Sequence, residues 1–149
     1  MDGIHLLGEW YGCPADTPHM LDAQALRTAC LDAVEAAGLT SVGDRFHQFE
    51  PQGVTGAVIL AESHLAIHTW PEMGSVTLDV YVCNYTTDNT AKAQALFRAL
   101  EMHLKPARSY VQAIRRGDVH DRDADPRDQA PRGVDDATDK ARVVEGADG

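Results

Sequence analysis

Residues 61–72 read AESHLAIHTWPE, and they follow the apolar stretch VTGAVILA at residues 54–61. From His64 to Trp70 the apolar and polar side chains alternate, which is typical of a β-strand with one buried face. The stretch 54–61 is apolar enough to predict a strand that is buried on both faces. Two rigid segments therefore meet at Glu62-Ser63, beside histidine, glutamate and tryptophan side chains, and we look for function there first.

The flanking sequence predicts further strands and two helices. Alternation or β-branched composition predicts strands at 4–11, 41–49, 76–83 and 109–115. In the strand 76–83 the alternation is clearest, and it places Cys83 on the polar face. Amphipathic helices are expected at 18–37 and, with Asp88 or Asn89 as the N-cap, up to Leu104.

This element order predicts an α/β (α+β) two-layer sandwich. With short connections between the middle strands, the sheet should be largely antiparallel and covered by the two helices on one face. The other face then needs a cover, and a second copy of the chain is the simplest one. The ordered domain is expected to end at residue 117, a small size at which association often helps to bury enough surface.

Composition changes sharply after residue 117. Residues 118–149 hold ten Asp or Glu, five Lys or Arg, and no Leu, Ile, Phe, Tyr or Trp, so we predict a disordered acidic tail. The tail carries half of the net charge of −10. An acidic chain with no basic stripe argues against a nucleic-acid partner.

Three cysteines form no CxxC pair, and no apolar stretch approaches the length of a membrane span. We therefore expect free thiols, a cytoplasmic location and no membrane association.

Three kinds of chemistry can be built from the central stretch. His64 and His68 have the spacing of two metal ligands on a helix, but in a strand they lie about 13 Å apart, so we predict no metal site. A serine hydrolase using Ser63 and Asp79 lacks the GxSxG turn that exposes the nucleophile.

The third kind of chemistry uses the Glu62-Ser63 peptide bond itself. The Ser63 hydroxyl can attack the preceding carbonyl and convert the amide into an ester, helped by strain that the flanking structure maintains. A base that removes the serine α-proton then eliminates the ester. The dehydroalanine that remains hydrolyses to a pyruvoyl group, which can form a Schiff base with a substrate amine and accept the electrons of a decarboxylation.

From Gly3 to Gly117 the chain closely resembles the prokaryotic S-adenosylmethionine decarboxylase family, which consists of short, self-processing proenzymes. The motifs that carry the resemblance are Phe46-His47 with Phe49, Pro51 to Gly56, Glu62-Ser63-His64, Ile67 to Glu72, and Asp79 with Cys83. The resemblance implies cleavage between Glu62 and Ser63, giving a β chain of residues 1–62 and an α chain that begins with the pyruvoyl group made from Ser63. No pyridoxal phosphate is then needed.

The resemblance also assigns roles to individual residues. His68 would be the proton acceptor in processing, and Cys83 would be the proton donor to the substrate carbon after decarboxylation. Phe49, Glu72 and Thr55 would bind the substrate, and Thr55 would also assist processing. His64 and Trp70 would pack around the site. The family fold is a two-layer sandwich, and its homodimer forms active sites from both protomers.

The implied function is conversion of S-adenosylmethionine to its decarboxylated form and CO2, for spermidine and polyamine biosynthesis. The sequence departs from many relatives at Gly74 to Leu78 and at Asn84-Tyr85, near the expected pocket. An alternative is therefore a pyruvoyl decarboxylase acting on ornithine or arginine, although Phe49 favours a substrate with a flat base. A third hypothesis is an unprocessed homologue that serves as a binding or regulatory partner, against which the intact Ser63, His68 and Cys83 argue.

Overall fold

The structure is a computed structural model, and it describes residues 2–117 and 144–145. Within these residues, the strands form one sheet in the order β2-β3-β4-β5-β1-β6-β7, and every neighbouring pair is antiparallel. The strands are β1 (Gly3–Tyr11), β2 (Ser41–Gln48), β3 (Val54–Leu60), β4 (Ser63–Trp70), β5 (Ser75–Cys83), β6 (Arg108–Arg116) and β7 (Val144–Glu145). The helices are α1 (Pro18–Leu21), α2 (Ala23–Ala36), α3 (Thr90–Leu104) and the 3-10 turn η1 (Pro71–Met73).

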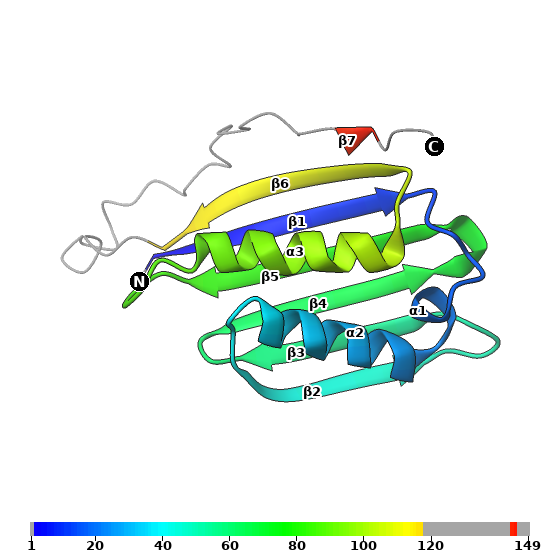
Figure 1. The fold of residues 1–149 in the computed structure, drawn as a ribbon, viewed down its shortest axis with the longest axis horizontal. Coiled ribbons are helices and arrows are strands. Elements are labelled where there is room, and N and C mark those ends of the chain that lie inside the picture. The colour runs from blue at the N-terminus through cyan, green and yellow to red at the C-terminus, as the bar shows by residue number, and fades with distance from the viewer. Residues whose placement is uncertain (1, 118–143, 146–149) are drawn as a thin grey trace, which may run out of the picture.

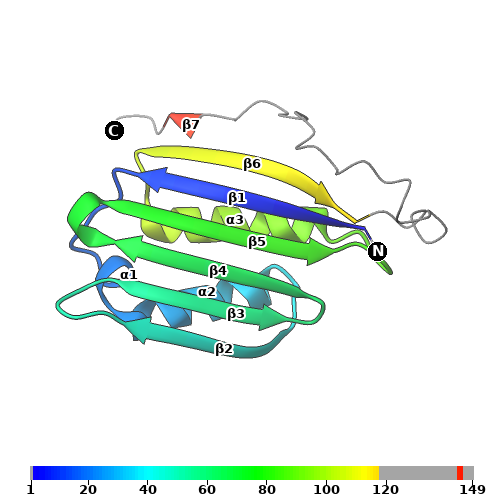
Figure 2. The ribbon, with the colours of Figure 1, turned by 180° about the vertical axis from the view of Figure 1, so that it is seen from behind.

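All three α-helices lie on one face of the sheet, as Figure 1 shows, and the view from behind in Figure 2 shows the other face uncovered. The core lies between helices and sheet and includes Trp10, Leu26, Leu65, Leu78 and Leu100, all fully buried. The predicted two-layer architecture with a largely antiparallel sheet is confirmed. None of the helices among the described residues is long and apolar enough to cross a membrane.

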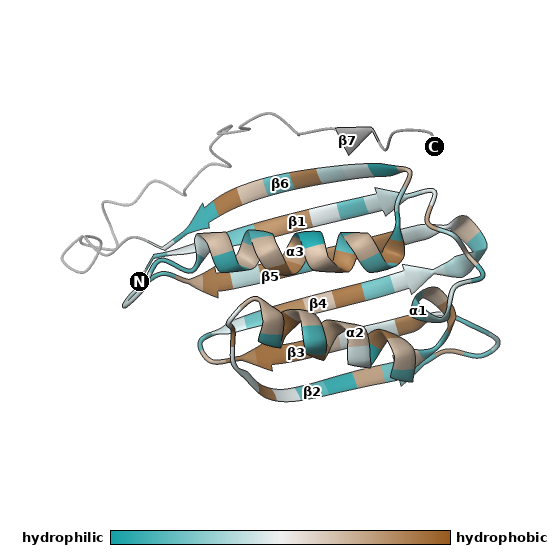
Figure 3. Cartoon of the chain, viewed as in Figure 1, coloured by the Kyte–Doolittle hydropathy of each residue, from teal (hydrophilic) through white to brown (hydrophobic). Residues whose placement is uncertain are grey.

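Period-two alternation decides which side chains reach the core. Along β4, Leu65, Ile67 and Thr69 are buried under the helices, while His64 and His68 lie on the uncovered face and are half-buried. The alternation of hydrophobic and hydrophilic residues along the strands is visible in Figure 3. The faces predicted for β4 and β5 are therefore confirmed.

Two local predictions were wrong. Residues 18–37 do not form one helix, because Asp22 takes an extended conformation (φ −115°, ψ 121°) and separates α1 from α2. The Asp22 carboxylate accepts a hydrogen bond from the Gln24 N–H at 2.9 Å and so begins α2 as an N-cap. Strand β3 is buried on one face only, and Ile59 is 57% exposed, because the helices cover a single side of the sheet.

The tail predicted for residues 118–149 lies outside the described residues except for Val144–Glu145. These two residues pair with Arg108 and Ser109 of β6. The boundary after residue 117 and the disorder of the tail stay predictions.

Candidate active site

The strand register brings Thr55 and His68 together on the uncovered face. They are direct cross-strand partners in the β3–β4 pair, and the Thr55 Oγ1 lies 3.0 Å from the His68 Nδ1. This contact fixes the orientation of the imidazole ring and leaves its Nε2 as the nitrogen available for other chemistry. A threonine hydroxyl that orients a histidine is the arrangement of a general base and its supporting group.

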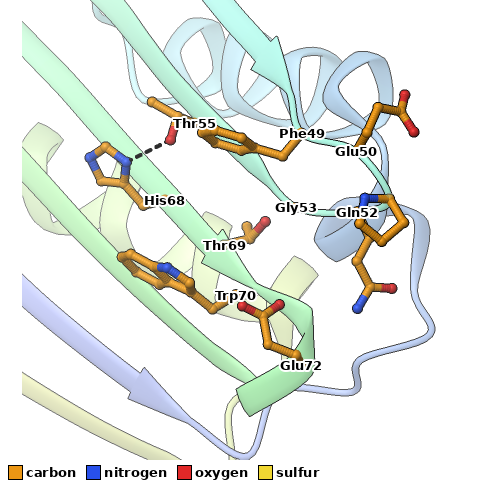
Figure 4. Close-up of a pocket in the computed structure, with 10 residues that line it drawn as sticks. Phe49, Glu50, Gln52, Gly53, Thr55, His68, Thr69, Trp70 and Glu72 are labelled. Atoms are coloured by element: carbon orange, nitrogen blue, oxygen red, sulfur yellow. Dashed lines mark hydrogen bonds between the residues drawn. The ribbon is translucent and has the colours of Figure 1, made fainter.

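A pocket of about 540 Å³ opens beside this pair. Its lining comes from the β2–β3 loop, from the ends of β3 and β4, and from η1: Phe49, Glu50, Pro51, Gln52, Gly53, Thr55, His68, Thr69, Trp70 and Glu72. Figure 4 shows the rings of Phe49 and Trp70 on two sides of the pocket and the Glu72 carboxylate at its rim. The volume is in the range of small-molecule sites, and aromatic walls with the carboxylates of Glu50 and Glu72 suit a flat, positively charged ligand.

A second group of candidate residues lies at the opposite end of β4. Ala61 and Glu62 form the two-residue link of the β3–β4 hairpin, in which Leu60 pairs with Ser63. The Ser63 Oγ accepts a hydrogen bond from the Cys83 N–H at 3.2 Å. The structure thus brings Ser63 and Cys83 together, from the start of β4 and the end of β5.

Glu62 has a left-handed backbone conformation, with φ 59°. For a residue with a Cβ this conformation costs on the order of 1–3 kcal/mol, and it persists only where the surrounding structure imposes it. The flanking strands impose it here, and the Ala61 N–H is held by the Thr40 carbonyl at 3.1 Å. Backbone strain is therefore stored directly beside the Glu62-Ser63 peptide bond.

Cys83 differs in position from the other two thiols. All three cysteines are free and buried. Burial raises the pKa of the Cys13 thiol to about 11 and that of the Cys30 thiol to about 12, so both thiols stay protonated and unreactive. Cys83 lies on the uncovered face of β5, at the sheet end that carries Ser63, and its backbone N–H donates a hydrogen bond to the Ser63 Oγ.

Imidazole and aromatic rings surround this end of the sheet. His5, His64 and Tyr81 are cross-strand neighbours on β1, β4 and β5, with ring centroids 5.5–6.0 Å apart. The His5 Nε2 lies 3.6 Å from the Asp79 carboxylate, yet burial lowers the pKa of His5 because desolvation outweighs that attraction. No sequence motif singled out His5 or Tyr81, and only their place in alternating strands could have indicated them.

The two groups of candidate residues do not meet within one chain. His68 lies five residues beyond Ser63 on β4, which is a separation of about 16 Å in an extended strand. Phe49, Thr55, His68 and Glu72 therefore gather at one end of the sheet, and Ser63 and Cys83 gather at the other. Among the described residues, no group of three or more His, Cys, Asp or Glu side chains could hold a metal ion.

Comparison with known proteins identifies the family of this chain. A sequence model described as S-adenosylmethionine decarboxylase matches residues 4–117. The chain belongs to the S-adenosylmethionine decarboxylase family. The match covers nearly the whole range over which the motifs indicated a resemblance, and it confirms that prediction.

Curated relatives in this family are named S-adenosylmethionine decarboxylase proenzyme. One from Methanococcus maripaludis is 36% identical over 119 residues, which is 80% of this chain and 93% of the relative. Another from Aquifex aeolicus is 39% identical over 119 residues, or 80% of this chain and 84% of the relative. The crystal structure of the adenosylmethionine decarboxylase from Aquifex aeolicus VF5 superposes with a TM-score of 0.72 at 36% identity, covering 83% of this chain and 97% of that one.

Proposed function

We propose that the chain is a self-processing, pyruvoyl-dependent S-adenosylmethionine decarboxylase. Its domain comprises residues 1–117, and cleavage gives a β chain of residues 1–62 and an α chain from Ser63. The products are decarboxylated S-adenosylmethionine and CO2, which supply spermidine and polyamine biosynthesis in the cytoplasm. The observation that carries the proposal is the strained Glu62-Ser63 link with Cys83 beside it, in a chain whose relatives are named as proenzymes.

Processing begins when the Ser63 Oγ attacks the Glu62 carbonyl carbon. The C–N bond breaks, the new ester joins Glu62 to the serine side chain, and the left-handed strain at Glu62 is released. A base then takes the Ser63 α-proton. The ester is eliminated, the main-chain carboxylate of Glu62 leaves, and residue 63 becomes dehydroalanine. Addition of water releases ammonia and leaves the pyruvoyl group. His68 is the base that we assign, oriented by its contact with Thr55.

Since His68 lies about 16 Å from Ser63 in its own chain, we assign the reacting histidine to a second copy. If two uncovered faces pack together with their strands reversed, the Ser63 end of one copy meets the His68 end of the other. The same arrangement buries Ile59 and Ile114, which are 57% and 46% exposed on that face. The homodimer then has two equivalent sites, each built from both chains.

The residues at the two ends of the face fit the pyruvoyl group and its substrate. Ser63 supplies the carbon atoms, and the Cys83 N–H is a hydrogen-bond donor at the place where the group forms. The pyruvoyl group supplies an electron sink for loss of CO2. Cys83 donates a proton to the substrate carbon, while the partner's pocket binds the adenine against Phe49 and the positive charge near Glu72.

A substrate panel tests the activity. Purified protein is incubated with S-adenosylmethionine, ornithine or arginine, each labelled in the carboxyl carbon, and released CO2 is counted. We expect release from S-adenosylmethionine alone, and none from the Ser63→Ala variant. Release only from ornithine or arginine would contradict the assigned substrate. No release from any of the three, by protein that stays full length, would favour the unprocessed binding partner.

A further inference from the structure

Gln48 is the last residue of β2, and its side-chain amide connects three segments of the chain. Its Oε1 accepts a hydrogen bond from the Ala23 N–H at 2.7 Å. Its Nε2 lies 2.7 Å from the Leu21 carbonyl oxygen, 3.1 Å from that of Gly53 and 3.2 Å from that of Phe49. Three acceptors surround the nitrogen and one donor faces the oxygen, so the chemistry of the neighbours fixes the orientation of the amide.

The break between α1 and α2 makes this contact possible. In a continuous helix the Ala23 N–H and the Leu21 carbonyl would both be used by helical hydrogen bonds. Because Asp22 is extended, the Ala23 N–H becomes a first-turn donor of α2 without a helical acceptor. The Gln48 amide bonds both groups: its oxygen accepts from the Ala23 N–H, and its nitrogen donates to the Leu21 carbonyl. The Gln48 amide therefore bonds to the backbone at the break between α1 and α2, which the sequence pattern failed to predict.

Thr69 makes a parallel connection from β4. It is 4% exposed, its Oγ1 donates to the Met20 carbonyl at 2.8 Å, and it accepts from the Val54 N–H at 2.9 Å. The carbonyls of Met20 and Leu21 thus hold the end of β4 and the end of β2 respectively. The pocket lies between these two strand ends and the loop that joins β2 to β3.

The loop of residues 49–53 depends on Gln48 for its position. Its own backbone contributes the hydrogen bond from the Phe49 N–H to the Gly53 carbonyl, at 2.9 Å. Gln48 binds the carbonyl of the first loop residue and that of the last one, so it fixes both ends of the loop against the helix break. The Phe49 ring, which is 46% exposed at the pocket, has its place set by this loop.

We propose that Gln48 is a positioning residue: through the α1–α2 break it orders the loop 49–53 and so sets the affinity of the pocket for its substrate. The proposal rests on the proposed function for the identity of the substrate, S-adenosylmethionine. The ordering of the loop can be measured without any substrate. Gln48 lies on the helix side of β2 and does not line the pocket, so it acts through Phe49 and not by contact.

The test compares Gln48→Met with Gln94→Met. Methionine keeps the length of the side chain and removes all four polar contacts, while Gln94 is an exposed residue of α3 that does not line the pocket. Hydrogen exchange is followed in peptides covering 49–55 and in peptides from β1 and α3. In Gln48→Met we expect about tenfold faster exchange in 49–55, the equivalent of one to two hydrogen bonds, with β1 and α3 unchanged.

Kinetics provide the second measurement. The KM for S-adenosylmethionine should rise about tenfold in Gln48→Met, while kcat stays within about twofold of the wild type and self-cleavage is complete. Only KM should change because the Phe49 ring, which the variant displaces, binds substrate and takes no part in the reaction. Gln94→Met should match the wild type in every measurement. Unchanged exchange in 49–55 would overturn the proposal, and so would faster exchange everywhere with KM unchanged, since that pattern describes a residue with a general structural role.

Gln48→Glu is the second variant, for use if methionine prevents folding. Its carboxylate can still accept from Ala23 but faces three carbonyl oxygens, so it should loosen the same loop. Unchanged exchange in this variant would overturn the proposal equally. If wild-type protein does not turn over S-adenosylmethionine, the proposed function fails, while the exchange of residues 49–55 still decides whether Gln48 positions the loop.

Discussion

Mixing two inactive variants tests whether each site is shared between chains. Ser63→Ala removes the residue that becomes the pyruvoyl group, and His68→Ala removes the assigned base. Each homodimer then lacks the same residue in both of its sites, and we expect neither to process. In the heterodimer, the intact Ser63 of one chain meets the intact His68 of the other, so one of its two sites is complete.

The expected yield follows from the geometry. Because Ser63 and His68 lie about 16 Å apart along β4, a single chain cannot bring them together. Equal co-expression with random pairing makes about half of the dimers heterodimers, and one of their two sites is complete, so about a quarter of all sites become active. About half of the His68→Ala chains should be cleaved, and none of the Ser63→Ala chains.

The assay is mass spectrometry of co-expressed, differently tagged chains, with each variant expressed alone as the control. Cleavage of about half of the His68→Ala chains, on co-expression only, is the predicted result. If co-expression produces no cleavage although the heterodimer is recovered through both tags, the shared site is refuted. Complete cleavage of His68→Ala expressed alone would instead refute the role of His68 as the base.

Three further predictions concern strain, packing and pH. Glu62→Gly removes the cost of the left-handed conformation, which is about 1–2 kcal/mol before the entropy cost of glycine is subtracted. The rate of self-cleavage, measured by mass spectrometry, should therefore fall by up to about fivefold. Faster cleavage would contradict the role of strain. In Gly56→Ala the added Cβ would clash with the Phe46 ring, so urea unfolding should show a loss of about 1–3 kcal/mol in the free energy of unfolding. A second change, Phe46→Leu, should partly restore it, and a stability equal to that of the wild type would contradict this reasoning. The pKa of His5 lies below its ordinary value of 6.5 in the folded protein, so below pH 6.5 the unfolded chain binds more protons than the folded one. The stability present above pH 6.5 is therefore lost as the pH falls through the folded pKa. His5→Gln should lose less stability than wild type between pH 7.5 and 5.5 in urea titrations, and equal losses would exclude this contribution.

The sequence predicted which faces of the strands carry the candidate residues, because a period of two allows only one assignment once the buried face is known. It placed Cys83 and His68 on the uncovered side, and the structure agrees. Their roles came from resemblance to a family, whose membership the comparisons confirm. The roles of individual residues stay proposals.

Features that depend on register and on tertiary contacts could not be predicted. The pairing of Thr55 with His68 follows from the length of the hairpin link at Ala61-Glu62, which alternation alone does not fix. Asp22 is a favoured N-cap residue, but the apolar helical pattern continues on both sides of it, so this one local signal did not predict the break. That break is stabilised by Gln48, a residue 26 positions away in the sequence. The one-sided burial of β3 likewise depends on where the helices lie.

The mass spectrum of the purified, undigested protein decides whether the chain cleaves itself between Glu62 and Ser63. We predict two fragments that divide after Glu62, of which the larger begins at residue 63 and has a blocked N-terminus that is modified by ketone-specific reagents. A single full-length mass from folded protein would contradict it. In that case the strained Glu62-Ser63 link would not be a cleavage site, and the enzyme would lack its electron sink.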